Sequence, residues 1–79
     1  MTNLEKYNAA FVNAFECEED VLPGLKYQSI IDWDSVGHMA LIGELEEAFD
    51  IEFEMQDIID FSDYQKGKEI LKKYNVTVE

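Results

Sequence analysis

The sequence predicts an all-α fold, a small bundle of three main helices plus one short helix that spans residues 1–79 as a single domain. Three observations indicate this fold. Apolar side chains recur at helical spacing in three separate segments. A chain of 79 residues is long enough for one domain only, and apolar residues make up 47% of it, which is enough to build a compact core.

The first helix is expected over residues 3–16, with Thr2 or Asn3 as its N-cap. Its apolar face consists of Leu4, Tyr7, Phe11 and Phe15. Pro23 and Gly24 interrupt the helical pattern, and the segment LPGLKYQSIIDW reads as a loop of about a dozen residues. Its apolar side chains suggest that this loop packs onto the core.

The second helix is expected from about Ser35 to Asp50, and residues 51–54 form a short extended link. One or two helical turns are expected over residues 55–61, and the last main helix over residues 63–74. The predicted core draws on all of these segments and includes Leu4, Tyr7, Phe11, Phe15, Ile30, Leu41, Leu45, Phe49, Ile51, Ile58, Ile70 and Leu71.

The charge balance is strongly acidic, with 18 acidic against 6 basic residues and a net charge of −12. Such a surface repels phosphate backbones and anionic lipid headgroups, so we expect neither nucleic-acid binding nor membrane-surface binding. Eleven acidic residues and no lysine lie between Tyr27 and Gln65. Proteins with positively charged surfaces are therefore the favoured partners.

The single cysteine, Cys17, cannot form an internal disulfide, so no oxidising compartment is implied. The N-terminal segment lacks a basic stretch followed by an apolar run, and no segment approaches the ~18 apolar residues of a membrane span. We therefore expect a cytoplasmic monomer that does not insert into membranes.

The second helix carries two apolar faces when it is wound at 100° per residue. One is the core stripe formed by Leu41, Ile42, Leu45, Ala48 and Phe49. The opposite face carries Val36, Met39, Ala40 and Gly43. Glu47 continues the same line, with Glu44 on one flank and Glu46 and Asp50 on the other. A methionine-bearing strip between carboxylates is typical of a transient docking surface. Because scattered exposed apolar residues are normal, the helix alone leaves an ordinary surface equally open.

Ser35 stands at the start of this helix. If Asp34 is the N-cap, Ser35 occupies the first helical position and its hydroxyl faces solvent without a partner. The same helix end carries partial positive charge, so a phosphate esterified to Ser35 would be stabilised there. This position therefore suits a covalently modified serine.

The site sequence Asp34-Ser35-Val36 leads into an apolar helix with Leu41, Leu45-Glu46-Glu47 and Phe49-Asp50-Ile51, followed by an acidic short-helix segment. This pattern resembles the acyl carrier protein family, and the resemblance covers essentially the whole chain. It implies an acyl-carrier-like bundle with a phosphopantetheine arm esterified to Ser35. The thiol of the arm would carry acyl or aminoacyl groups as thioesters, and the chain itself would catalyse nothing.

The resemblance also implies roles for neighbouring residues. Asp34 would cap the helix and help recruit the phosphopantetheinyl transferase that adds the arm. The residues expected to contact acyl-activating or acyl-transferring enzymes, including their basic docking patches, are Val36, Met39, Ala40, Glu44, Glu46, Glu47 and Asp50.

Three departures from fatty-acid carriers favour a carrier of a specialised pathway. Val36 replaces the leucine of the site, and Gly37 and Ala40 stand where acidic residues are usual. Trp33 replaces the small residue that usually precedes the aspartate. The identity of the cargo stays open.

A catalytic serine is the first competing interpretation, because Asp34, Ser35 and His38 lie within one helical turn. The motif G-x-S-x-G is absent, however, and winding the helix puts His38 at the edge of the core stripe rather than beside Ser35. A lone histidine there is usually packed or hydrogen-bonded, so we expect no catalytic residues and no enzyme activity.

Two further alternatives involve the same segment. Asp32-x-Asp34-x-Val36-Gly37 copies part of a calcium loop, but Val36 and Gly43 stand at two positions that require ligands, so we expect no metal site. The remaining alternative is an unmodified acidic adaptor that docks basic partners through the second helix.

Overall fold

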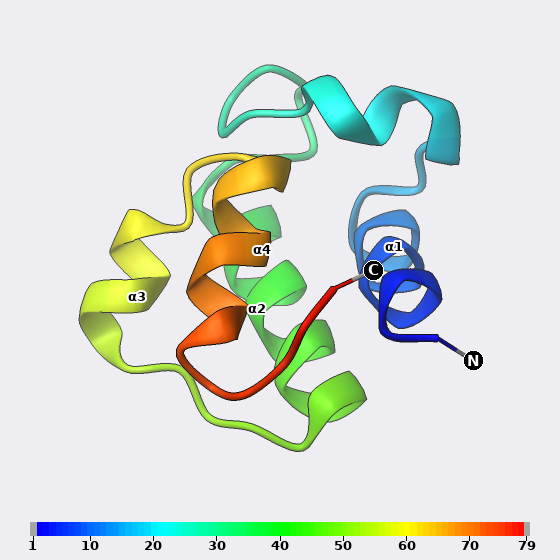
Figure 1. The fold of residues 1–79 in the computed structure, drawn as a ribbon. Coiled ribbons are helices and arrows are strands. Elements are labelled where there is room, and N and C mark those ends of the chain that lie inside the picture. The colour runs from blue at the N-terminus through cyan, green and yellow to red at the C-terminus, as the bar shows by residue number, and fades with distance from the viewer. Residues whose placement is uncertain (1, 79) are drawn as a thin grey trace.

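The chain folds into helices joined by irregular segments in the computed structural model, which describes residues 2–78 (Figure 1). In chain order the elements are α1 (Asn3–Phe15), the 3₁₀ helix η1 (Glu19–Gly24), α2 (Ser35–Phe49), α3 (Met55–Asp60) and α4 (Tyr64–Lys72). Within residues 2–78 there is no strand, only an isolated bridge between Lys26 and Asp63. The prediction of an all-α bundle with three main helices and one short helix is confirmed.

The helix starts follow from short side chains that cap the backbone. Thr2 accepts a hydrogen bond from the backbone N–H of Glu5, whose carboxylate accepts one from the N–H of Thr2, which completes a capping box. Asp34 caps α2 and Asp63 caps α4. Each of these side chains accepts a hydrogen bond from the backbone N–H of the residue three positions later in the chain. Because such caps are local, the sequence predicts the bounds of the main helices closely.

The prediction of a loop over residues 22–33 is wrong for its first three residues, because residues 22–24 belong to η1. This helix is held by short-range bonds such as that from the Leu25 N–H to the Leu22 carbonyl at 3.0 Å. Its buried residue is Leu22, and Leu25, directly after the helix, is buried too. A helix of this kind is too short to show an apolar periodicity, so the sequence pattern does not predict it.

The core contains many aromatic rings, and those of α1 lie at its centre. The Phe11 ring packs edge-on against Tyr7, Trp33 and Tyr64 at centroid distances of 5.0, 5.7 and 5.2 Å. Edge-to-face packing of this kind adds to the stabilisation from burial alone. The Tyr7 hydroxyl donates to the Tyr64 carbonyl at 2.6 Å, and its burial raises the pKa of that hydroxyl.

Most of the predicted core is buried: Tyr7, Phe11, Phe15, Leu41, Leu45, Ile70 and Leu71. The other predicted members are only half-buried: Leu4, Ile30, Phe49, Ile51 and Ile58. The core also contains residues that the sequence analysis did not select, among them Trp33, Phe53, Phe61 and Tyr64. Trp33, Phe53 and Phe61 lie in connecting segments, where no periodicity marks the inward-facing positions.

α4 can approach this core closely because Gly67 has no side chain. A β-carbon at Gly67 would lie 2.2 Å from the Phe61 ring and 2.2 Å from the Tyr7 hydroxyl. The chain after α4 then returns beside α1 (Figure 1), where the Asn3 side-chain amide donates to the Thr77 carbonyl at 3.0 Å. The two ends of the described chain therefore lie close together.

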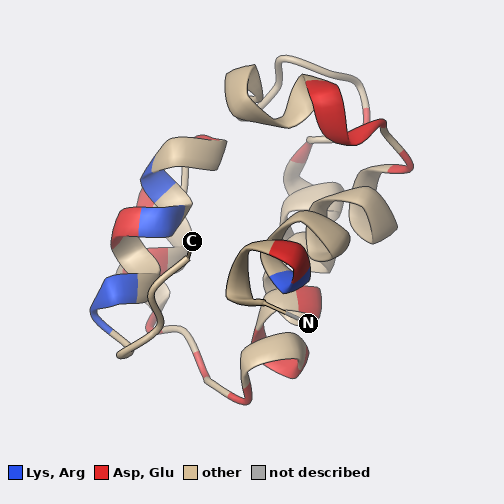
Figure 2. Cartoon of the chain, turned by 45° about the vertical axis from the view of Figure 1, so that its right-hand side comes forward, with Lys and Arg blue, Asp and Glu red and all other residues tan. Residues whose placement is uncertain are grey.

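Charge is distributed unevenly over the fold. Figure 2 shows lysines gathered on α4 and acidic residues on η1 and α2. No helix within residues 2–78 combines the length and the apolar character needed to span a membrane.

Candidate functional site at the start of α2

Ser35 is the first residue of α2, and its side chain is exposed. Asp34 is the N-cap, as predicted, and its carboxylate accepts from the Gly37 N–H at 2.8 Å. Among the hydrogen bonds formed within residues 2–78, none uses the Ser35 hydroxyl. The cap is therefore supplied by the neighbour, and the serine oxygen is free at the positive end of the helix.

Gly37 fixes the position of this end against the preceding loop. A β-carbon there would lie 1.8 Å from the Asp32 carbonyl oxygen and 3.3 Å from the Phe15 ring. The loop backbone thus packs directly on the first turn of α2, and only glycine leaves room for it. In the sequence, Gly37 stands out as a departure from related sites and as part of the partial calcium-loop pattern, and neither feature indicates this role.

Trp33 and His38 form the interior side of the site. The buried Trp33 donates its indole N–H to Nδ1 of His38 at 3.0 Å, and Nε2 of His38 lies 2.7 Å from the Ile58 carbonyl oxygen. Because an indole nitrogen only donates, Nδ1 must accept, and the ring hydrogen is on Nε2 and is donated to Ile58.

Both ring nitrogens of His38 are therefore engaged, and neither is free to take a proton from Ser35. The Asp34 carboxylate accepts from the Gly37 N–H. The described residues thus do not assemble the serine, histidine and aspartate into a hydrogen-bonded triad.

A groove of about 370 Å³ opens beside Ser35, between α2 and α3. It lies within the size range of small-molecule pockets, ~300–1,000 Å³. Its lining is mainly apolar and consists of Tyr27, Ser35, His38, Met39, Ile58, Ile59, Phe61 and Ser62. The sequence pattern does not predict this groove, because the groove depends on how the short helix α3 is placed against α2.

Exposed apolar side chains lie on the first turns of α2, on the loop before it and on α3. Val36 is 77% exposed and Met39 is 54% exposed, and Ala40 is also exposed, as the helical pattern predicts. The structure adds Ile31 from the loop, and Met55 and Ile59 from α3, which the pattern did not indicate. We call this set the apolar rim: Ile31, Val36, Met39, Ala40, Met55 and Ile59.

The predicted carboxylates lie further along α2. Glu44 is the nearest of them to Ser35, and it is still roughly 14 Å away along the helix axis at 1.5 Å per residue. Glu47 and Asp50 are exposed. Glu46 is half-buried and accepts from the Phe53 N–H at 2.9 Å, so it is tied to the link before α3. The structure therefore does not bring these four carboxylates together with Ser35.

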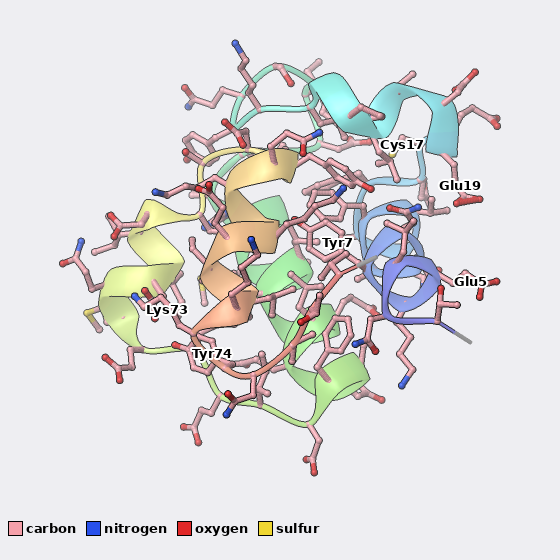
Figure 3. All side chains as sticks on the ribbon, viewed as in Figure 1. Glu5, Tyr7, Cys17, Glu19, Lys73 and Tyr74 are labelled. Carbon is pink, nitrogen blue, oxygen red and sulfur yellow. The ribbon has the colours of Figure 1, made fainter. Side chains whose placement is uncertain are left out.

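α3 is connected to the end of α4 through Asp57, which is the one buried charged side chain within residues 2–78. The Lys73 amine and the Tyr74 hydroxyl donate to its two oxygens at 2.5 and 2.6 Å. Figure 3 labels these two residues beside α3. The Lys73 amine and then the Tyr74 hydroxyl lower the pKa of the Asp57 carboxyl, because both donate to its charged form.

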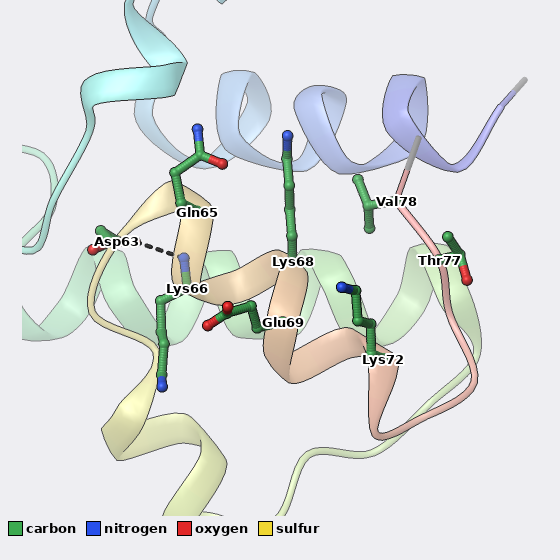
Figure 4. A pocket seen from close by; sticks show the side chains of 8 residues that line it. All are labelled: Asp63, Gln65, Lys66, Lys68, Glu69, Lys72, Thr77 and Val78. Atoms are coloured by element: carbon green, nitrogen blue, oxygen red, sulfur yellow. Dashed lines mark hydrogen bonds between the residues drawn. The ribbon is translucent and has the colours of Figure 1, made fainter.

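A second groove, of about 460 Å³, lies between α4 and the C-terminal segment (Figure 4). It is lined by Asp63, Gln65, Lys66, Lys68, Glu69, Lys72, Thr77 and Val78. The Asp63 carboxylate already caps α4, and the Lys68 amine lies 4.7 Å above the Tyr64 ring. This groove shares no lining residue with the one beside Ser35.

Clusters of metal ligands and the cysteine thiol are the other candidates for chemistry in the described part of the chain. Within residues 2–78, no group of three or more His, Cys, Asp or Glu residues is arranged to hold a metal ion. Cys17 is half-buried, and burial raises the pKa of its thiol, which disfavours the nucleophilic thiolate. The start of α2 is thus the place where a free nucleophile, a positive helix end and an apolar surface meet.

Comparisons of this chain with family models, with curated proteins and with solved structures give no match.

Proposed function

We propose that this chain is an acyl carrier protein, which holds acyl or aminoacyl groups as thioesters on a phosphopantetheine arm attached to Ser35. One observation carries the proposal. The Ser35 hydroxyl is exposed and without a hydrogen-bond partner, while the adjacent Asp34 caps the helix. A serine that is not needed for the cap, and that belongs to no hydrogen-bonded triad with His38 and Asp34, is free to serve as an attachment point.

The surroundings of Ser35 fit a phosphodiester. Because Asp34 takes the Gly37 N–H, the amides of Ser35 and Val36 remain at the positive end of α2, where they favour a negative group. When attached, phosphopantetheine supplies the thiol that carries the acyl group. The contribution of this chain is to hold the attachment oxygen in solvent on a capped helix end.

The apolar rim and the acidic residues support docking to enzymes. The rim residues next to Ser35, such as Val36 and Met39, would contact a partner enzyme close to the arm. Glu44, Glu47 and Asp50 would attract basic surfaces from further along α2, and Glu46 less so because of its bond to Phe53. Individual exposed pairs contribute only about 0–1 kcal/mol, which suits a carrier that must dissociate.

The same proposal covers the partners and the place of action. We propose a cytoplasmic monomer that meets a phosphopantetheinyl transferase and the acyl-activating or acyl-transferring enzymes of a specialised pathway. The departures at Trp33, Val36, Gly37 and Ala40 from fatty-acid carriers support the specialised assignment.

The test is an intact-mass measurement after incubation with coenzyme A and a broad-specificity phosphopantetheinyl transferase. We expect the wild type to gain one phosphopantetheinyl group and Ser35→Ala to gain none. Ser62→Ala is the matched control, because Ser62 is an exposed serine that lines the same groove, and it should be modified like the wild type. Far-UV circular dichroism would verify that all three proteins are folded.

The alternative function is an unmodified acidic adaptor, which the net charge of −12 and the apolar rim would also serve. It predicts no gain of mass in any of the folded variants. It also predicts that Ser35→Ala binds partners as well as the wild type does.

A further inference from the structure

We propose that His38 is a positioning residue that holds the C-terminal half of α3 against the Ser35 end of α2. The proposal concerns the described fold and goes beyond the proposed function. Only its last step, on arm attachment, rests on that function.

α3 has little apolar anchoring of its own. It is six residues long, and two of its apolar side chains, Met55 and Ile59, are 77% and 67% exposed. Its one buried residue is the charged Asp57, and Ile58 is only half-buried. A helix of this length does not persist in water without tertiary contacts, so polar contacts must account for much of its placement.

His38 supplies one of these contacts by capping the end of α3. The Ile58 carbonyl lies in the last turn of α3, where carbonyls lack partners within the helix. His38 donates its Nε2–H to this oxygen at 2.7 Å, while its Nδ1 accepts from the buried Trp33 at 3.0 Å. The imidazole thus links the core to the backbone of α3.

The orientation of the imidazole is fixed by its aromatic neighbours. The Trp33 ring lies nearly parallel to it, with an interplanar angle of 16°, and the Tyr27 and Phe61 rings meet it edge-on. The histidine can therefore present Nε2 to α3 in a defined direction, which a mobile side chain could not do.

The first half of α3 has a separate anchor. Asp57 accepts from Lys73 and Tyr74, and the Tyr74 hydroxyl accepts from the Glu54 N–H at 2.9 Å. Removing the contact of His38 should therefore loosen the second half of α3 while the first half stays attached. The second half carries Ile58 and Ile59, which line the groove beside Ser35.

Two substitutions separate the two hydrogen bonds of His38. In His38→Asn, the side-chain oxygen can replace Nδ1 as the acceptor for Trp33, but the donor to Ile58 is lost. In His38→Gln, the amide N–H can replace Nε2 as the donor to Ile58, but Trp33 loses its acceptor. Gly43→Ala is the control on the same helix, because a β-carbon there meets no atom within 4 Å.

Amide hydrogen exchange tests the proposal. His38→Asn should speed exchange at residues 59–61 roughly tenfold, while His38→Gln and Gly43→Ala should exchange there like the wild type. Fluorescence of Trp33, the single tryptophan, should show the opposite order and change more in His38→Gln than in His38→Asn, because both variants lose the parallel imidazole ring but only His38→Gln also leaves the indole N–H without its acceptor. Equal exchange rates at residues 59–61 in all variants and the wild type would overturn the proposal. An equal increase in exchange rate throughout α2 and α3 in His38→Asn would also overturn it.

Arm attachment provides a second readout. In His38→Asn the KM of the transferase for this chain should change severalfold with kcat little altered, because Ser35 and Asp34 are untouched while the surface beside them moves. An unchanged KM despite a loosened α3 would overturn this step. If the wild type accepts no arm, the proposed function fails, but the exchange result still decides the role of His38.

Discussion

Trp33 and Ser35 lie two positions apart and have opposite environments. The Trp33 side chain is fully buried and hydrogen-bonded to His38, whereas the Ser35 side chain is exposed and its hydroxyl is free. The comparison shows how a small domain presents a free hydroxyl oxygen at the start of a helix. The interior part of the junction before α2 is buried and hydrogen-bonded, and these contacts position the exposed part.

The largest loss of stability should come from changing Trp33, on the interior side of this junction. Trp33→Ala should cost about 3–5 kcal/mol of unfolding free energy, because it removes the largest fully buried side chain. Urea denaturation followed by far-UV circular dichroism measures the loss. Since a loss of this size can unfold a small domain, Trp33→Phe should be measured too. It keeps a ring but leaves His38 without its donor, and a cost below a few tenths of a kcal/mol would contradict the role of the hydrogen bond.

The second largest loss of stability should come from disturbing the contact between the loop and α2. Gly37→Ala should lower stability by about 1–3 kcal/mol, because the added β-carbon collides with the Asp32 carbonyl. Gly43→Ala is the matched control in open space on the same helix, and it should raise stability by about 0.5–1 kcal/mol. Thermal unfolding of the two variants checks the difference, and equal melting temperatures would contradict the close packing.

The stability that Asp57 contributes by anchoring α3 should depend on pH. Because Lys73 and Tyr74 lower the pKa of Asp57 in the folded protein, its carboxylate adds stability above the unfolded pKa, ~3.9, and this is lost as pH falls through the folded pKa. Asp57→Asn should therefore be less stable than the wild type at neutral pH, with a difference that shrinks below about pH 4. Urea denaturation across this range tests the sign, and a difference that grows on acidification would contradict it.

The smallest losses of stability should come from changing the exposed residues Asp34 and Ser35. Asp34→Ala should cost about 1 kcal/mol, because the Gly37 N–H loses its acceptor. Ser35→Ala should change stability by less than about 0.5 kcal/mol, because its hydroxyl has no partner. Urea denaturation of both variants sharpens the comparison, and a larger loss at Ser35 than at Asp34 would mean that the serine is structural.

The sequence predicts the helices well because their signals are local. Thr2, Asp34 and Asp63 cap backbone groups a few residues away, and the apolar spacing in α1 and α2 identifies their buried faces. The predicted cap at Asp34 and the exposure of Ser35 are found in the structure for the same reason.

The rest of the site could not be predicted because it depends on contacts between distant segments. The bond from His38 to Ile58 joins residues 20 apart, and the apolar groove exists only because α3 is held there. Ile31 and Ile59 belong to the apolar rim through a loop and a short helix, where no periodicity marks the exposed positions. The role of Gly37 also required the position of the Asp32 carbonyl.

The central claim is that Ser35 is an attachment point, and peptide mapping after the transferase reaction tests it most directly. The chain has three serines, at positions 29, 35 and 62. We predict that fragmentation of the modified peptides places the phosphopantetheinyl group on Ser35 alone. An unmodified chain, or an arm found on Ser29 or Ser62, would contradict the account.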